Sequence, residues 1–414
     1  MSRPGYDRSE SGGRVSTAKD AATTRVEADS NALVALSHQL HGHPELAYEE
    51  ERSAAWVAEL LSSDPRFTVT TGVAGLPTAF TATAGRGPLH IGICAEYDAL
   101  PGIGHGCGHN IIASAAVGAG LALAALADDL GITVTVFGTP AEEGGGGKIV
   151  MLDAGVFDGV HAAMMVHPSP SESDRMHCLS VSHFDVHYHG KTAHASAFPQ
   201  NGINAADAIT VAQVGIGLLR QHIKATDRIH GIVTKGGDAP NIVPDHTIAK
   251  FYARSRTVAE LADLEPRVQR CFEAGAIATG CTHEIIHHSA PYSEFLDDED
   301  MVALYRTNAE LVGRRFPAPQ KRRPQGQPHD GEHAFSASTD MGNVSLQIPS
   351  IHPMLGLNCL PAVNHQAEFT AACITAEADR AVRDGALAMA FTAIDLAQTP
   401  EQRQRLLAGG GPRS

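Results

Sequence analysis

Four side chains that could bind a metal ion or transfer a proton lie in one glycine-rich stretch, residues 94–110 (CAEYDALPGIGHGCGHN). They are Asp98, His105, Cys107 and His109. One glycine separates Cys107 from His109, and it lets the backbone bend until a thiolate and an imidazole could face the same ion. That donor pair suits zinc or another borderline divalent metal. An isolated Cys-Gly-His is more often a buried cysteine beside a helix cap, so the interpretation depends on which other residues converge on it.

The segments on either side of this loop indicate where it lies. Residues 89–94 (LHIGIC) are predicted to form a short buried strand, and residues 111–126, which are rich in small side chains, a helix. The loop therefore follows the carboxyl end of a strand, which is where open α/β sheets bind their ligands.

A second candidate is the adjacent pair Glu142 and Glu143, which follows a predicted strand at residues 132–137. Two neighbouring carboxylates at a strand end repel each other unless a cation or a proton relieves the repulsion. One of the two could bind a metal ion while the other acts as a base. An ordinary exposed acidic turn is the competing interpretation.

The glycines after this pair also suggest a phosphate-binding loop, whose motif is Gly-x4-Gly-Lys-Ser/Thr. With Gly147 and Lys148 as its Gly-Lys, the motif needs a glycine at position 142 and a serine or threonine at position 149. The chain has Glu142 and Ile149 there. The nucleotide-binding interpretation therefore fails at both ends.

A third strand is predicted at residues 160–166, and it leads to His167. Three successive strand ends thus offer Cys/His, Glu/Glu and His, and together they predict a metal site at one edge of a sheet. Either His352 or His365 could complete the ligand set, and spacing alone does not choose between them.

The length of 414 residues exceeds that of most single cores, so two domains are expected. Residues 28–176 and 291–414 have α/β character. Residues 177–290 between them show the order strand, helix, strand, strand, helix, strand, which is typical of a small ferredoxin-like α+β domain. This domain is predicted to be an insertion. It carries His194 on a loop and Asn241 in a turn, and locally each could be an ordinary loop residue.

The N-terminal residues 1–27 contain few large apolar side chains and are predicted to be a disordered extension. A helix is expected to begin at Asp29 or Ser30 and to end near residue 39, and a second helix to cover residues 49–62. His41 and His43 lie between these helices and are interpreted as structural. Residues 321–327 are predicted to form a polar surface loop.

The formal net charge of −15 argues against nucleic acid or an anionic membrane surface as a partner, because both require basic patches. The sequence has no uninterrupted apolar run of about 18 residues and no apolar core of a signal peptide near its start. Seven scattered cysteines, an odd number, do not indicate a disulfide framework. A cytoplasmic protein is therefore expected.

Several motifs resemble, in order, those of the dinuclear metallopeptidase family that includes aminoacylase, glutamate carboxypeptidase and the bacterial dipeptidases. They are AEYDALPGIGHGCGHN, PAEEGGGGKI, GKTAHAS, GGDAPNIVPD and STDMGNVS. Within the family, the chain is similar to the amidohydrolase branch with p-aminobenzoyl-glutamate hydrolase, the indole-acetyl-amino-acid hydrolases and β-alanyl-lysine dipeptidase. Asn110, where many indole-type members have Asp, favours the first and last of these. Gly106, where relatives often have Ala, is a mild departure.

The resemblance implies a zinc-peptidase-like catalytic domain, with a mixed sheet flanked by helices, and an inserted domain that acts as a lid and dimerisation module. It implies two divalent metal ions per subunit, zinc or manganese, with Glu142 as general base. The implied metal ligands are Cys107, His109, Glu143, His167 and His365. With this ligand set, His352 does not bind a metal ion.

The resemblance further implies that His194 reaches an active site, commonly that of the partner subunit in a homodimer, where it would help to stabilise the oxyanion. Asn241 and Arg254 are chosen as residues that hold the carboxylate of the substrate. The guanidinium of Arg254 has the fork that suits a carboxylate, although a surface charge is an equal alternative.

The predicted reaction is hydrolysis of the amide bond of a dipeptide or an N-acyl or aminobenzoyl amino acid, by a metal-activated water with Glu142 as general base. Two alternatives are an N-acyl-amino-acid deacylase rather than a dipeptidase, and a catalytically silent metal-dependent binding protein. Neither the acyl group, nor the amino-acid preference, nor the metal follows from the sequence.

Overall fold

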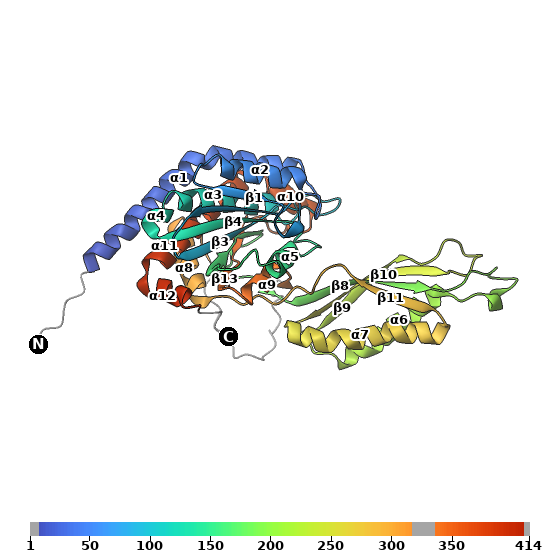
Figure 1. Ribbon diagram of the computed structural model, residues 1–414. Helices are drawn as coiled ribbons and strands as arrows, with labels where there is room; N and C mark the ends of the chain where they lie inside the picture. The colour runs from blue at the N-terminus through green and yellow to red at the C-terminus, as the bar shows by residue number, and fades with distance from the viewer. Residues whose placement is uncertain (1–7, 317–335, 410–414) are drawn as a thin grey trace, which may run out of the picture. The chain divides into compact units, whose positions relative to one another are not determined.

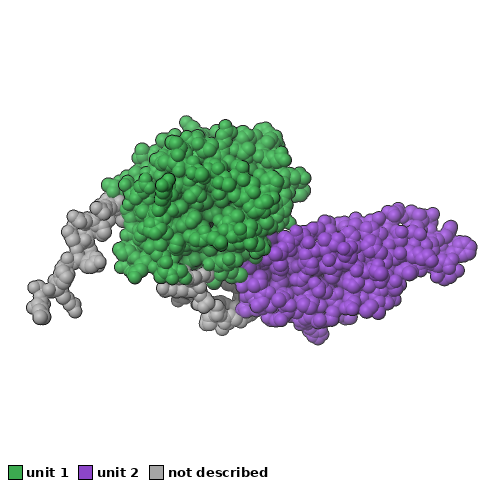
Figure 2. Space-filling view, in the orientation of Figure 1, with its two compact units in different colours: residues 1–176, 295–334, 343–414 green, residues 177–294, 335–342 purple. Residues whose placement is uncertain are grey.

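The computed structural model describes residues 8–316 and 336–409, and the predicted loop at residues 321–327 lies outside them. The chain forms two compact units, which Figure 2 shows in green and purple. Unit 1 comprises residues 1–176, 295–334 and 343–414, and unit 2 comprises residues 177–294 and 335–342. The second, short segment of unit 2 carries strand β12 (Ser336–Ala337), which pairs in parallel with β7 (His177–Cys178).

Unit 1 is built on a mixed six-stranded sheet with the strand order β1-β2-β4-β3-β5-β13 (Figure 1). Strands β3, β4, β5 and β13 run parallel to one another, whereas β1 and β2 form antiparallel pairs. The six strands are β1 (Thr68–Thr71), β2 (Phe80–Gly85), β3 (Leu89–Glu96), β4 (Ile132–Thr139), β5 (Ala162–Met164) and β13 (Ser350–Ile351). A separate parallel pair consists of β6 (His167–Ser169) and β14 (Met354–Gly356).

The central strands β3 and β4 are almost fully buried, as expected for parallel strands that are covered on both faces. Because β4, β3 and β5 are parallel neighbours, their carboxyl ends lie at the same edge of the sheet. The predicted loops that follow these strands are therefore brought together.

The helices of unit 1 cover this sheet. They are α1 (Arg8–Gly42), α2 (Glu51–Ser62), α3 (His109–Ala124), α4 (Ala127–Leu130), α5 (Gly147–Asp153), α8 (Glu299–Leu311), α10 (Ala367–Ala372), α11 (Ala376–Gln398) and α12 (Pro400–Leu407). Helix α9 (Met341–Ser345) crosses the boundary between the units, and η1 (Val73–Gly75) is a short 3₁₀ turn. None of the described helices combines the length and the apolar character needed to cross a membrane.

Helix α3 is buried along its whole length and contacts α1, α11, β3 and β4. Its small residues permit this close approach. A Cβ atom at Gly120 would lie 2.4 Å from Cγ2 of Val136, and one at Gly118 would lie 2.8 Å from the side chain of Leu33. The small-residue pattern that predicted this helix thus fixes the position of its N-terminus, where His109 lies.

The prediction of a disordered extension over residues 1–27 is wrong for the described part, because α1 is a continuous helix from Arg8 to Gly42. The predicted helix start at residue 29 or 30 is wrong for the same reason. The buried residues recur at helical spacing and include Ala22, Val26 and Leu33. Much of this stripe is alanine, which is small. The segment therefore has few large apolar side chains, and its composition suggested disorder. Packing on α3 and α11, together with the 2.8 Å ion pair between Lys19 and Asp395, stabilises the helix.

Unit 2 has the predicted element order of a ferredoxin-like fold, with a four-stranded antiparallel sheet in the order β11-β8-β10-β9. Helices α6 and α7 lie on one face of this sheet (Figure 1). The elements are β8 (Ser180–His189), α6 (Ala205–Leu219), β9 (Arg228–Lys235), β10 (His246–Ser255), α7 (Val258–Thr279) and β11 (Thr282–His287), with 3₁₀ turns η2 (Pro199–Asn201) and η3 (Arg220–His222).

Candidate metal centre

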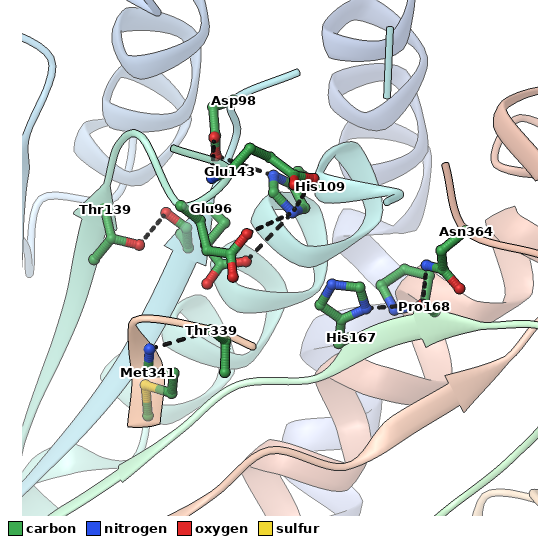
Figure 3. Close-up of polar contacts among 12 residues, drawn as sticks. Glu96, Asp98, His109, Thr139, Glu143, His167, Pro168, Thr339, Met341 and Asn364 are labelled. Atoms are coloured by element: carbon green, nitrogen blue, oxygen red, sulfur yellow. Dashed lines mark hydrogen bonds and ion pairs between the residues drawn. The ribbon is translucent and has the colours of Figure 1, made fainter. Parts of the chain in front are cut away.

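Several predicted residues of unit 1 lie near the carboxyl ends of β3 and β4, and Figure 3 shows His109, Glu143 and His167 there. Glu96 is the last residue of β3, and His109 is the first residue of α3. Glu142 and Glu143 follow β4, whereas His167 begins β6. The parallel pairing of β3 with β4 and of β3 with β5 explains why segments so far apart in the sequence converge.

The bend between Cys107 and His109 depends on Gly108. This glycine has φ of 75°, in the left-handed region that favours glycine, and it caps helix α3. A Cβ atom there would lie 2.8 Å from Cγ of Pro168 and 3.1 Å from Sγ of Cys373. The expected role of the glycine in this turn is therefore confirmed.

Two groups of donor atoms share Cys107. The first consists of Cys107, His109 and His167, and the second of Cys107, Glu143 and His365. Within each group the potential ligand atoms all lie within 4.8 Å of one another. Two neighbouring groups with one residue in common could hold a pair of adjacent cations.

His109 is oriented for a ligand. Its Nδ1 atom lies 3.0 Å from Oδ1 of Asp98, and both side chains are buried. Its Nε2 atom is buried and has no hydrogen-bond partner among the described residues. A carboxylate on one ring nitrogen is the usual way to fix the tautomer of a metal-binding histidine, because it leaves the lone pair of the other nitrogen for the metal.

Asp98 also positions a second candidate ligand, since its Oδ2 atom accepts a 2.9 Å hydrogen bond from the backbone N–H of Glu143. His365 lies on the other side of that residue, with Nε2 3.8 Å from Oε2 of Glu143. The backbone N–H of His365 donates to the carbonyl oxygen of Gly106 at 3.0 Å. The loop with His365 is thus tied to the loop with Cys107.

Three side chains of this centre have a raised pKa, so each holds its proton more tightly than usual. Burial raises the pKa of the Cys107 thiol well above its usual value, and the carboxylate of Glu143 adds to the effect. Burial likewise raises the pKa of Glu143. For His109, burial opposes protonation, but the carboxylate of Asp98 outweighs it and the pKa is raised well above the usual value. A divalent cation would replace these protons and relieve the charge repulsion.

The side chains of this centre are therefore suitable ligands for divalent metal ions. The centre offers a thiol, imidazoles and carboxylates that are buried except for the half-buried Glu143 and the exposed His365, and the Nε2 atom of His109 has no hydrogen-bond partner among the described residues. Thiolate and imidazole favour zinc, whereas added carboxylate oxygens also suit manganese.

Glu142 lies beside the candidate ligands. It is 7% exposed, and its Oε2 atom is 3.9 Å from Nε2 of His109. Together with Glu96 and His109 it also forms a third donor group. The geometry alone thus allows Glu142 to act as a base or as a ligand.

The sequence interpretation missed Glu96 and the structural role of Lys148. Glu96 lies 3.6 Å from Nε2 of His109, and its Oε1 atom lies 2.6 Å from Nζ of Lys148. Both side chains of this ion pair are completely buried. The available signal was the pair of acids, Glu96 and Asp98, two residues apart at a strand end. Lys148 was considered only as part of a phosphate-binding motif.

The remaining histidines differ from the candidate ligands in their contacts. His352 is fully buried, with its ring 5.5 Å from that of His167, and burial holds its pKa well below the usual value. It belongs to none of the donor groups found among the described residues. His41 and His43 each bond to a backbone carbonyl oxygen, of Thr370 and Gln39 respectively, in agreement with their structural interpretation.

His105, the fourth polar residue of the opening loop, is likewise outside the donor groups that the described part of the chain contains. Burial lowers its pKa to about 3, so the imidazole is neutral at ordinary pH. Its ring stacks on that of His41 with centroids 6.3 Å apart. His105 therefore packs against the C-terminal end of α1.

The other three predicted site residues belong to unit 2. The structure brings His194 next to Asn241, because the N–H of Ala195 donates to the carbonyl oxygen of Asn241 at 3.0 Å and His194 forms a bridge with Ile242. Arg254 lies on β10, where its Nη1 atom donates to Oγ of Ser338 at 2.7 Å. Arg254 is therefore part of the hydrogen-bonded sheet region and not a freely moving surface charge.

Asp98→Asn is expected to weaken metal binding by about 10- to 100-fold, the usual effect of removing a carboxylate that orients a ligand. The amide keeps the size of the side chain but loses the charge beside His109. Metal affinity can be measured by competition with a chromophoric chelator. The exposed Asp129→Asn in α4 serves as the control, and an Asp98→Asn affinity equal to that of the control would contradict the assignment.

A mixed sheet flanked by helices, with thiol, imidazole and carboxylate donors gathered at its strand ends, is the arrangement of a candidate metal centre in an α/β protein. The sequence pattern of Peptidase family M20/M25/M40 matches residues 92–376. The chain belongs to this family and is a hydrolase of amide or peptide bonds, which confirms the predicted enzyme class and disfavours the silent binding protein.

Individual relatives agree with this assignment. The chain is 34% identical over 417 residues to the Xaa-Arg dipeptidase of Mus musculus, covering 97% of this chain and 94% of the relative. It is 34% identical over 280 residues to one of the p-aminobenzoyl-glutamate hydrolase subunits of Escherichia coli (strain K12), covering 63% and 58% respectively. The solved structure of an aminobenzoyl-glutamate utilization protein from Klebsiella pneumoniae superposes with a TM-score of 0.68 at 18% identity, covering 89% of this chain and 97% of that one.

Proposed function

We propose that the protein is a dinuclear metallodipeptidase that cleaves the peptide bond of small dipeptides. The observation that carries the proposal is the environment of His109. Its Nδ1 atom is held by Asp98, and its Nε2 atom, without a partner among the described residues, lies among Cys107, His167 and the acid pair. The proposed ligands are Cys107, His109, Glu143, His167 and His365, and zinc or manganese is the proposed metal.

The proposed division of labour follows from the positions of the two acids. Glu143 belongs to a donor group with Cys107 and His365, whereas Glu142 does not. Bound divalent ions would polarise the substrate carbonyl and acidify a water molecule. Glu142 would accept the proton of the water that attacks the amide carbon and would then deliver it to the leaving amine nitrogen.

The substrate class is proposed from the relatives and from charge. The similarity to the Xaa-Arg dipeptidase extends over nearly the whole chain. A net charge of −15 also attracts a cationic dipeptide better than a doubly anionic aminobenzoyl-glutamate. Dipeptides with a C-terminal arginine are therefore the first substrates to test. Location in the cytoplasm stays a prediction from the sequence.

A side-by-side assay tests this choice. Xaa-Arg dipeptides, p-aminobenzoyl-glutamate and N-acetyl amino acids are supplied with zinc, manganese or cobalt, and release of the amine is measured. The dipeptides are expected to give the highest kcat/KM. A higher value for the N-acetyl compounds would favour the deacylase, and the absence of turnover on all three classes would reject the proposed activity.

The role proposed for unit 2 is that of a dimerisation module which supplies His194 to the active site of a partner subunit, with Asn241 and Arg254 holding the substrate carboxylate. His194 and Asn241 lie on hydrogen-bonded neighbouring loops, so one approach could bring both to the same substrate. An isologous dimer would exchange these loops between two sites.

A mixing experiment tests the exchange. His194→Ala and Glu142→Gln homodimers are each expected to be nearly inactive. Mixed dimers contain one site with both residues intact, so activity should return as the subunits exchange. Exchange verified by mass-tagged subunits, without any return of activity, would show that His194 acts within its own chain or has no catalytic role.

A further inference from the structure

The sheet of unit 2 has one face covered by helices and one face rich in histidine. Phe184, Val186 and Tyr188 of β8 are buried in the core beneath α6 and α7. Because side chains alternate along a strand, the intervening His187 and His189 point to the opposite face. His246 of β10 shares that face, because it lies directly opposite His189 in the antiparallel register.

These three histidines form a compact cluster near one end of the sheet. His246 is the cross-strand partner of His189 and the diagonal neighbour of His187. The ring of His246 stacks on that of His189 with centroids 4.7 Å apart and an angle of 9°, and its centroid lies 5.3 Å from that of His187. One nitrogen from each ring can be chosen so that all three lie within 4.8 Å of one another.

The separations match those of a metal site. Nδ1 of His187 lies 3.1 Å from Nε2 of His246. Two nitrogens that share a tetrahedral zinc ion at the usual bond length are about 3.3 Å apart. The rings are half-buried or exposed, so an ion could reach them, and the strands already hold the side chains together.

The surroundings of His246 favour its neutral form. Burial, the neighbouring His189 and the cation of Lys235 lower the pKa of His246. Neutral imidazole is the form that binds metals. Glu284 of β11 lies opposite His187 in the register and therefore shares this face of the sheet.

We propose that His187, His189 and His246 bind one divalent transition-metal ion, of the zinc, nickel or copper class, separate from the catalytic centre. All three residues belong to unit 2, and none is among the proposed catalytic ligands. Nitrogen-only donation from imidazole suits these ions.

The cluster also lies at the base of two loops with proposed functions. His189 ends β8, five residues before His194, and His246 begins β10, five residues after Asn241. The N–H of Gly190 already donates to the carbonyl oxygen of Asp245 at 2.7 Å between these strand ends. An ion bound to both strands would brace the two loops together.

The test measures how many zinc ions the full-length protein binds when its catalytic sites are filled. The wild type and the variants are dialysed to equilibrium at the same free zinc concentration, and their zinc content is then measured by elemental analysis. The wild type is expected to bind one more zinc ion per chain than the His189→Ala/His246→Ala double variant. His230→Ala, which removes an exposed histidine on β9 of the same sheet, is the matched control and should bind as many ions as the wild type. Equal zinc content in the wild type and the double variant would overturn the proposal.

A spectroscopic readout separates this site from the catalytic one. One equivalent of Cu²⁺ added to the zinc-loaded protein should give an electron paramagnetic resonance spectrum with nitrogen hyperfine structure. The nitrogen hyperfine structure should be lost in the double variant and in His187→Gln. The single variant is milder and is included in case the double variant misfolds. An unchanged spectrum in well-folded His187→Gln and double variants would also overturn the proposal. Both readouts are independent of peptide hydrolysis.

Discussion

Replacing Glu142 with glutamine is expected to lower turnover by about a hundredfold or more while both catalytic metal ions stay bound. General-base catalysis contributes rate factors of this order. The side-chain amide has the same size as the carboxylate but cannot accept the proton of the attacking water. Because Glu142 lies outside the two donor groups that share Cys107, the metal content should not change.

The neighbouring Glu143→Gln variant provides the matched comparison. Glu143 belongs to a donor group with Cys107 and His365, so this change should lower metal occupancy as well as activity. Elemental analysis and initial rates, measured on both variants, separate the two roles. Glu142 also forms a group with Glu96 and His109, so loss of metal from Glu142→Gln would reassign it as a ligand.

The convergence of the site could be predicted because it depends on local patterns and one topological rule. Short apolar strands were followed by Cys107, by Glu143 and by His167, and parallel neighbouring strands place such ends at one edge of a sheet. The structure has this pairing, with β3 between β4 and β5. No knowledge of long-range contacts was needed for that step.

The choice between His352 and His365 could not be made from spacing. His352 lies between β13 and β14, and His365 follows β14. Both are histidines in loops near the last strands of unit 1. Only the fold shows that the loop of His365 is hydrogen-bonded to Gly106 beside Cys107, whereas His352 packs between His167 and Phe295 in the buried interior.

The N-terminal helix and the Glu96–Lys148 pair were missed for a different reason. Alanine-rich α1 is stabilised by packing on α3 and α11, and such tertiary contacts outweigh a polar composition. Lys148 follows four glycines, and in the sequence it was weighed only as part of a phosphate-binding motif. Its burial depends on a carboxylate more than fifty residues away in the sequence, which no local pattern reveals.

The second large effect is expected from Lys148→Met, which should lower the free energy of unfolding by about 3–5 kcal/mol in metal-free protein. The Nζ atom of Lys148 lies 2.6 Å from Oε1 of Glu96, and both side chains are completely inaccessible to solvent. Removing the cation leaves the carboxylate of Glu96 buried without its partner. Methionine nearly fills the space of the lysine stem, so little of the loss comes from packing.

The chain has a single tryptophan, Trp56 in α2, which packs against the core of unit 1. Its fluorescence during urea unfolding therefore reports on the unit that contains the ion pair. The double variant Lys148→Met/Glu96→Gln removes both charges and should be clearly more stable than Lys148→Met alone. A double variant as unstable as the single one would show that the loss comes from packing and not from the unpaired charge.

Metal ions give an independent check of the electrostatic origin. Oε2 of Glu96 lies 3.6 Å from the Nε2 atom of His109, so a cation at the proposed centre would partly compensate the unpaired carboxylate. Saturating zinc should therefore reduce the destabilisation of Lys148→Met relative to the wild type measured under the same conditions. A packing defect would give the same difference with and without zinc, and that result would contradict the assignment of Lys148 as the buried counter-ion of the centre.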